Sequence, residues 1–340
     1  MRQIWIPRAG PPEVLELRKA PDPAPAAGEV RIRVAAAGVN FADIMGRLGI
    51  YPDLPPMPVV PGYEVAGRVD EVGDGVDTSW VGREVLAATR FGGYSDVVCA
   101  PVGQVFTRPL GMTAEEGAAL VVNYLTAYQL VEVMGSLGAD ETMLVHSAGG
   151  GVGIAATQLA RRIGASVIGT ASVGKHEFLR SIGVEHTIDY RTEDFEVRVR
   201  EITGGRGVDL VLDAVGGSSF KKGYRLLAPA GRIGMFGISA AAVGKRRSLV
   251  AFLRTALSLP WFQFTPISLI DKNKGAFGVN MLHMWDEMPR LRTWMEALLA
   301  YYKEGAIGPV IDTTFPFERA ADAHHYIQDR KNVGKVLLVP

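Results

Sequence analysis

What the chain has little of narrows the classes of function open to it. One cysteine in 340 residues cannot form a disulfide within the chain, so a cytoplasmic setting is expected. The 36 basic and 36 acidic residues cancel and no long basic run is present, so nucleic acid is not expected as a partner. The N-terminus lacks the apolar core of a signal peptide. The most apolar later stretch, 249–270, is interrupted by Arg254 and Pro260 and falls short of a membrane span.

A glycine-rich turn in the middle of the chain is its clearest functional signal. The apolar run 143–146 predicts a strand, the sequence SAGGGVG follows at 147–153, and 154–160 favours a helix. This is the context of a dinucleotide site, because glycines allow close backbone approach to a pyrophosphate and a helix N-terminus offers free N–H groups. A turn that only packs strand against helix is the alternative. The predicted contacts are Ser147, Gly150, Gly151, Val152 and Gly153.

The pattern of strands and helices changes near residue 120. Before it, short strands such as 29–34, 65–73, 84–88 and 94–100 are separated by glycine and proline turns, which is typical of a barrel-like β unit. After it, a helix is expected at 120–133, and strands then alternate with helices, which predicts a doubly wound parallel sheet. Those strands are expected at 143–147, 166–170, 186–189, 208–213 and 231–236.

The end of the chain returns to the first pattern. The strand predicted at 333–339 is expected to rejoin the N-terminal β unit. The sequence therefore predicts an α/β chain of two domains. The β-rich domain comprises 1–120 and 285–340, and the parallel-sheet domain comprises 121–284.

Five motifs carry a family resemblance over essentially the whole chain. They read GVNFAD at 38–43, PGYEVAG at 61–67, GGYSD at 92–96, YLTAY at 124–128 and GKV at 334–336. In this order they resemble the zinc-independent medium-chain dehydrogenase/reductases of the quinone oxidoreductase (zeta-crystallin-like) group. The ending, 332–340, resembles the branch of synaptic-vesicle amine-transport-protein homologues. The resemblance implies a GroES-like β-rich catalytic domain, a Rossmann domain and a homodimer.

The same resemblance indicates that no metal is bound. Related alcohol dehydrogenases hold a catalytic zinc with Cys and His, whereas this chain has Asn40 and Tyr63 at those positions and lacks the cysteine-rich structural zinc lobe. Without a Lewis acid the oxidation of a simple alcohol is difficult. Reduction of an electrophilic quinone or enone depends mainly on positioning and on polarisation of a carbonyl.

The end of the second predicted strand of the parallel sheet indicates NADPH as the cofactor. An acidic residue there would bind the ribose diol and repel a 2′-phosphate, and the sequence GTASVGK at 169–175 has none. Lys175 and Ser172 provide a charge and a hydroxyl for the phosphate, and Tyr190 matches a phosphate-contacting tyrosine by the resemblance. A solvated lysine is the alternative for Lys175.

Three residues are candidates for catalysis. Asn40 and Asp43 are expected to line the cleft, where Asn40 would bind the nicotinamide ribose or a substrate carbonyl. Tyr51 is the best candidate for a donor to a substrate oxygen, because a phenol donates a hydrogen bond without a metal. The structural alternatives are a turn-forming Asn40, a capping or ion-paired Asp43 and a packed Tyr51.

Further cofactor contacts follow from the resemblance, with a structural role as the alternative for each. Thr126 lies where the family places a hydroxyl beside the nicotinamide. The remaining candidates are Phe236, Gly237, Phe277, Val279, Asn332 and Lys335.

The segment 240–274 stands apart from these motifs. Its basic residues, 245–247, precede an apolar and aromatic stretch. Covering an apolar substrate pocket or packing at a dimer interface is favoured, and lying on a membrane surface is the less favoured alternative.

Three functions remain open. The leading hypothesis is an NADPH-dependent reductase of quinones. The second is reduction of the C=C bond of enones or alkenals in the same cleft. The third is a cofactor-binding protein with little turnover that acts as a structural or membrane-trafficking factor, because cofactor binding and turnover are separable.

Overall fold

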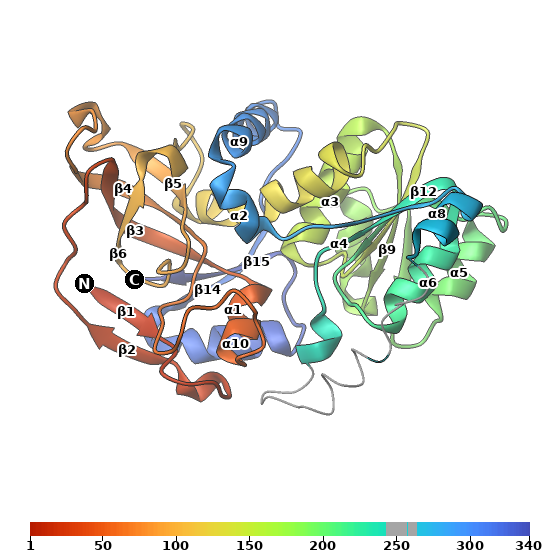
Figure 1. The fold of residues 1–340 in the computed structure, drawn as a ribbon, viewed down its shortest axis with the longest axis horizontal. Coiled ribbons are helices and arrows are strands. Elements are labelled where there is room, and N and C mark those ends of the chain that lie inside the picture. The colour runs from red at the N-terminus through yellow and green to blue at the C-terminus, as the bar shows by residue number, and fades with distance from the viewer. Residues whose placement is uncertain (243–256, 258–263) are drawn as a thin grey trace.

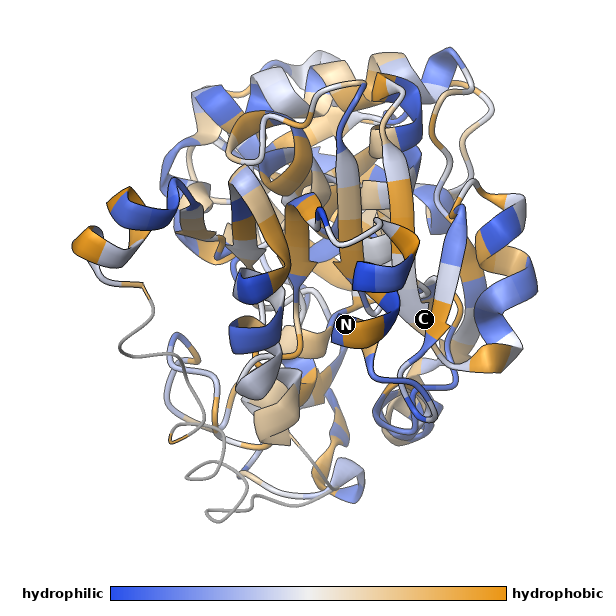
Figure 2. Ribbon diagram, turned by 90° about the vertical axis from the view of Figure 1, so that its right-hand side faces the viewer, coloured by the Kyte–Doolittle hydropathy of each residue, from blue (hydrophilic) through white to orange (hydrophobic). Residues whose placement is uncertain are grey.

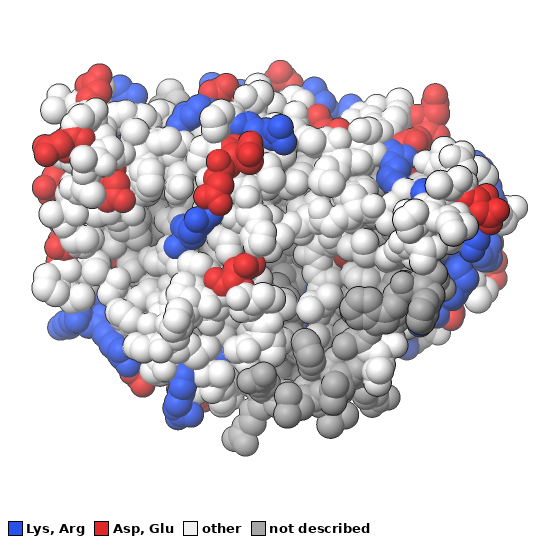
Figure 3. Space-filling model, viewed as in Figure 1, with Lys and Arg blue, Asp and Glu red and all other residues white. Residues whose placement is uncertain are grey.

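Two sheets lie side by side in the computed structural model, which describes residues 1–242, 257 and 264–340 (Figure 1). Both termini lie at the first sheet. On the face drawn in Figure 3, acidic and basic side chains are interspersed, and neither sign forms one continuous patch.

The first sheet has seven strands in the order β14-β15-β3-β4-β5-β7, with β6 paired to β3. Its C-terminal strands join as predicted: β15 is antiparallel to β3, with Val336 opposite Val39, and β14 is parallel to β15. The strands are β3 (Glu29–Val39), β4 (Glu64–Val72), β5 (Glu84–Ala88), β6 (Val97–Pro101), β7 (Val105–Thr107), β14 (Ile311–Pro316) and β15 (Lys335–Val339), and a separate ribbon pairs β1 (Arg2–Trp5) with β2 (Glu16–Lys19).

The second sheet is parallel throughout, in the order β10-β9-β8-β11-β12-β13. This confirms the predicted doubly wound sheet, whose order reverses direction between β8 and β11, the switch point where such sheets bind ligands. The strands are β8 (Thr142–His146), β9 (Ser166–Ala171), β10 (His186–Asp189), β11 (Val208–Asp213), β12 (Leu227–Met235) and β13 (Gly275–Gly278).

Alternation along these strands builds two apolar layers. Val145 and Leu212 share one cluster with α3, whereas Leu144 and Val211 face a second cluster with α5 and α6. Figure 2 shows hydrophobic strands between helices whose outer faces are hydrophilic. The helices are α1 (Phe41–Arg47), α2 (Ala114–Tyr128), α3 (Gly151–Ile163), α4 (His176–Ser181), α5 (Phe195–Ile202), α6 (Ser218–Leu226), α8 (Pro266–Lys272), α9 (Met288–Lys303) and α10 (Ala320–Gln328).

Helix α2 joins the two halves. It packs against β3, β4 and β5 on one side and against α3 on the other. One apolar cluster therefore continues from Leu86 of the first sheet through Leu125 to Val145 of the second. The domain boundaries at 120 and 285 stay predictions.

The sequence-based limits of several elements differ from those of the structure. The helix expected from residue 120 begins at Ala114, because Thr113 and Glu116 form a capping box, and after Tyr128 it continues as a π-helical turn, Gln129–Val133. Strand β12 starts at Leu227 rather than 231. The strand expected near 94–100 starts only at Val97.

The apolar segment 240–274 falls largely on residues 243–256 and 258–263, which lie outside the described residues. Its predicted roles at a pocket, an interface or a membrane therefore stay predictions. Within the described ranges, no helix combines the length and the apolar character needed to cross a membrane.

Gly153→Ala should destabilise the chain, because the added Cβ would lie 2.6 Å from the Ser147 carbonyl oxygen and 2.7 Å from Ala148 Cα, both backbone atoms. We expect a loss of roughly 1–3 kcal/mol, measured as a lower unfolding midpoint. Gly103→Ala is the matched control, since a Cβ there meets nothing within 4 Å. Equal midpoints for the two variants would contradict this packing argument.

Candidate functional site

The glycine turn lies at the carboxyl end of β8. Ser147 has a φ of 55°, in the left-handed region, and its carbonyl accepts the Gly150 N–H at 2.9 Å. Helix α3 starts at once, with no side-chain cap and no acidic residue in its first turn. Its first N–H groups are therefore open to an anion, and no carboxylate competes for them.

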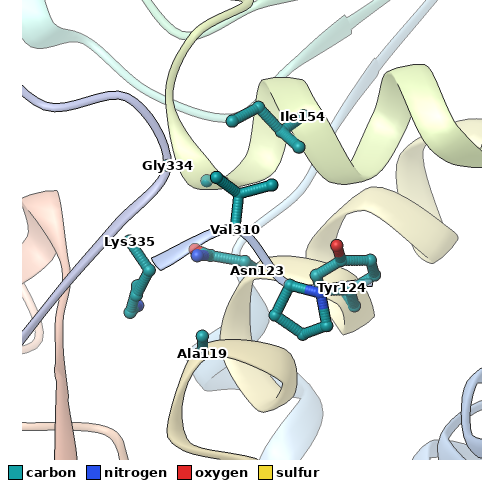
Figure 4. A pocket seen from close by; sticks show the side chains of 9 residues that line it. Ala119, Asn123, Tyr124, Ile154, Val310, Gly334 and Lys335 are labelled. Carbon is teal, nitrogen blue, oxygen red and sulfur yellow. The ribbon is translucent and has the colours of Figure 1, made fainter. Parts of the chain in front are cut away.

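The segment before β15 lies against this turn. The Gly334 N–H donates to the Gly149 carbonyl at 2.9 Å, and Lys175 Nζ donates to the Asn332 carbonyl. Figure 4 shows the seam between α2, α3 and this segment, where Asn123 and Lys335 border a cavity of about 10 Å³. That space admits at most one water molecule.

Positive charges gather around Tyr190, at the ends of β9 and β10. Arg330 Nη1 donates to the Tyr190 hydroxyl at 3.5 Å, and the Arg330 and Arg191 guanidinium carbons lie 5.7 and 5.9 Å from its ring centroid. Burial acts to raise the pKa of Tyr190, but these two arginines outweigh it and the pKa falls. The pKa of Lys175 is lowered by burial and also by the charges of Arg191 and Arg330.

This cluster brings together residues that are far apart in the sequence. The predicted Lys175 and Tyr190 meet there, and Ser172 begins the short turn that carries Lys175. Arg191 and Arg330 were not predicted from the sequence. Arg191 directly follows Tyr190, and Arg330 lies two residues before Asn332. Their closeness in the sequence to predicted cofactor contacts is the signal that could have indicated them.

The predicted Asn40 and Lys335 also meet, in a buried cluster built on Glu64. Lys335 Nζ donates to Asn40 Oδ1 at 2.7 Å and to Glu64 Oε1, and Asn40 Nδ2 donates to Glu64 Oε1 at 3.0 Å. Glu64 Oε2 accepts the Val122 N–H at 2.7 Å. Glu64 was not predicted from the sequence. The cluster ties β3, β4, β15 and α2 together, and pairing is what makes these buried charges tolerable.

Asp43 makes the contacts of a capping residue, which is the structural alternative to its predicted catalytic role. Its carboxylate accepts the Asn40 N–H at 2.8 Å and the Gly62 N–H at 2.9 Å, which caps α1. It also accepts the Tyr94 hydroxyl at 3.2 Å, and this hydroxyl lies 3.1 Å from His324 Nε2. Burial raises the pKa of Asp43 to about 7, although the two backbone N–H groups oppose the rise.

Tyr51 belongs to an aromatic row with Tyr63 and Phe91. The Tyr51 and Tyr63 ring centroids are 6.2 Å apart, edge to face, and those of Tyr63 and Phe91 are 5.2 Å apart. Burial, with the charges of Asp53 and Asp43, raises the pKa of Tyr51 to about 12, so its phenol is neutral at physiological pH.

The loop that carries Tyr51 is tied to the parallel-sheet half of the chain. Asp53 accepts from Asn280 Nδ2 at 3.1 Å and lies 3.0 Å from His283 Nε2. Asn280 and His283 follow directly after β13. The Tyr51 loop therefore faces the carboxyl ends of the parallel strands.

The remaining predicted contacts divide into two groups. Phe236, Gly237, Phe277 and Val279 lie at the neighbouring ends of β12 and β13, where the Val279 N–H donates to the Met235 carbonyl at 2.9 Å. Thr126 instead donates to the Val122 carbonyl at 2.7 Å within α2, so its hydroxyl already has a partner. In the part of the chain that the structure describes, no group of three or more His, Cys, Asp or Glu is arranged to hold a metal ion.

The raised pKa of Asp43 predicts a pH dependence of stability. Between its ordinary pKa of 3.8 and about 7, the folded chain binds the proton more tightly than the unfolded chain does. Asp43 should therefore lower the free energy of unfolding as the pH rises through this window, by on the order of a few kcal/mol. Carboxyl ¹³C NMR should give a midpoint near neutrality, and a midpoint near 4 would contradict the assignment. Urea unfolding of Asp43→Asn should lose this slope, with the exposed Asp140→Asn as control.

Comparison with known proteins covers both halves of the chain. A family model described as an alcohol dehydrogenase GroES-like domain matches residues 26–133, and one described as a zinc-binding dehydrogenase matches 182–338. The synaptic vesicle membrane protein VAT-1 homolog of Rattus norvegicus is 44% identical over 329 residues, covering 96% of this chain and 80% of its own length.

Solved structures agree with these matches. The quinone oxidoreductase of Escherichia coli complexed with NADPH superposes with a TM-score of 0.87 at 29% identity, covering 100% of both chains. The CurK enoyl reductase superposes with a TM-score of 0.84 at 28% identity, covering 99% of this chain and 98% of its own. These matches confirm the predicted GroES-like and Rossmann halves. The chain therefore belongs to the medium-chain dehydrogenase/reductase family, in the branch of the VAT-1 homologues.

Proposed function

We propose that this oxidoreductase uses NADPH to reduce a quinone without a metal. The observation that carries the proposal is the cluster of Lys175, Arg191 and Arg330 around Tyr190. Three cations at one place suit a phosphate dianion, and the end of β9, 169–175, carries no acidic residue that would repel it.

The turn at the start of α3 fits the rest of such a cofactor. Its uncapped N–H groups suit a pyrophosphate, and the closely packed Gly153 allows the helix to begin there. When bound, NADPH supplies a hydride to the acceptor. The E. coli neighbour complexed with NADPH supports the assignment of this cofactor.

The chain itself contributes neutral hydrogen-bond donors and an apolar wall. Tyr51 stays protonated because its pKa is raised to about 12, so it donates to an acceptor oxygen without changing its charge. Phe91 and Tyr63 extend the wall beside it. Exclusion of water by these rings strengthens each polar contact made to the acceptor.

Two alternatives each have a specific support. Reduction of the C=C bond of an enone or alkenal is supported by the likeness to the CurK enoyl reductase. A cofactor-binding role in vesicle trafficking with little turnover is supported by the likeness to the VAT-1 homolog.

Assembly and location belong to the same proposal. β13 is an outer strand of the parallel sheet and is paired only with β12 among the described strands. An open strand edge of this kind suits pairing with a second copy, so we propose a homodimer. We propose a cytoplasmic location as well, with membrane association of the 240–274 segment as the alternative.

The purified chain tests the function directly. NADPH oxidation is followed at saturating quinone and, separately, at saturating enone. Turnover with quinone supports the leading proposal, and turnover with enone alone replaces it with the second. Tight NADPH binding without turnover on a broad panel of acceptors would favour the trafficking role.

Arg330→Ala should weaken NADPH binding by roughly tenfold or more and leave NADH binding nearly unchanged, because it removes one phosphate partner. Calorimetric Kd values for both nucleotides measure this. The control is Arg319→Ala, which should change neither Kd. Arg319 is exposed, lies just before α10 and pairs with Asp322. An equal loss for NADH and NADPH would place Arg330 elsewhere than at the 2′-phosphate.

Tyr51→Phe should lower kcat for an enone at least several-fold, because it removes a donor to the substrate oxygen and keeps the ring. Steady-state kinetics at saturating NADPH measure the effect. An unchanged rate would remove Tyr51 from the mechanism and leave it as a packed aromatic residue.

A further inference from the structure

The buried hydroxyl of Tyr63 makes no hydrogen bond of ordinary length and angle among the described residues, and the Tyr51 phenol is close enough to raise its pKa. The residue is only 4% exposed. Such a hydroxyl lowers the stability of the folded chain, whereas a phenylalanine would fill the same space without that loss. By contrast, the buried Tyr94 hydroxyl is bonded to Asp43 and lies within reach of His324. The polar group of Tyr63 therefore calls for an explanation other than stability.

Tyr63 lies near the contact between the two halves of the chain. The ring stands between Tyr51 and Phe91, at centroid distances of 6.2 and 5.2 Å. It shares an apolar cluster with Val279 and Trp285, which follow β13 in the parallel-sheet half.

The electrostatics of the residue decide what its hydroxyl can do. Burial, together with the negative charge of Asp43, raises the pKa of Tyr63 far above its ordinary value. The phenol therefore remains protonated at any physiological pH. It is suited to donate a hydrogen bond and is unsuited to release its proton as a general acid.

We propose that Tyr63 is a catalytic residue whose hydroxyl donates a hydrogen bond to the carbonyl oxygen of the acceptor, alongside Tyr51. This rests on the proposed function and narrows its substrate class to acceptors in which a carbonyl is conjugated with the reducible bond. The acceptor gains a hydride and takes its proton from solvent, NADPH becomes NADP⁺, and Tyr63 keeps its own proton. The donor stabilises the charge that develops on the oxygen.

The test compares Tyr63→Phe with the control Tyr302→Phe. Tyr302 lies near the C-terminal end of α9, and its hydroxyl donates to Glu116 at 3.1 Å. Tyr63→Phe should lower kcat roughly 10- to 100-fold and leave the unfolding midpoint unchanged or higher. Tyr302→Phe should leave kcat unchanged. A Tyr63→Phe variant with the wild-type kcat, or with a clearly lower unfolding midpoint, would overturn the proposal.

A second readout does not depend on turnover. A ¹³C-carbonyl cyclohexenone is bound in the presence of NADP⁺, which cannot donate hydride, and its C=O stretching frequency is measured. The frequency should be lowered in the wild type and should move back toward the free value in Tyr63→Phe. The same frequency in both proteins, or no binding of the ketone to the wild type, overturns the inference.

The two readouts separate failure of the inference from failure of the proposed function. A wild-type chain that turns over no acceptor but lowers the carbonyl frequency through Tyr63 refutes the reductase and keeps the carbonyl site. A chain that turns over quinone, with Tyr63→Phe unchanged in rate and frequency, keeps the reductase and refutes the role of Tyr63.

Discussion

The buried pairing of Lys335 with Glu64 joins two strands of the first sheet to each other and, through the Val122 N–H, to α2, the helix that packs against both halves of the chain. Glu64 also accepts from Asn40 and from the backbone of α2, so one carboxylate connects β3, β4, β15 and the helix between the sheets. Breaking a buried pair of this kind leaves an uncompensated charge and typically costs about 3–5 kcal/mol. Because Lys335 is held there, the residues just before it reach the glycine turn through Gly334 and reach Lys175 through Asn332.

The proposed site has two chemically different ends. At one end, Arg330, on the segment that leads to β15, joins Lys175 and Arg191 around Tyr190. At the other end, Tyr51 and Tyr63 present phenols that burial keeps neutral. The first end suits a phosphate and the second suits a carbonyl oxygen. In the proposed function, charged side chains therefore hold the cofactor and neutral hydrogen-bond donors assist the reaction.

Local sequence patterns predicted much of the fold and of the candidate site. Most of the features that they did not predict are contacts between residues far apart in the sequence. The parallel sheet was predicted from the alternation of strands and helices. Strands that are buried on both faces must be apolar, so they stand out in the sequence. The start of α2 was missed although the capping box Thr113–Glu116 is local. Arg330 and Tyr190 are 140 residues apart, and Lys335 and Glu64 are 271 apart, so only the fold shows that they meet. The hydrogen bond of Thr126 to the Val122 carbonyl likewise could not be read from the motif, and its predicted contact with the cofactor stays a prediction.

The most direct test of the central claim is a crystal structure of the chain with NADP⁺. The account predicts the 2′-phosphate among Lys175, Arg191 and Arg330, the pyrophosphate at the first turn of α3, and the nicotinamide facing Tyr51. A 2′-phosphate that projects into solvent, away from all three cations, would contradict it.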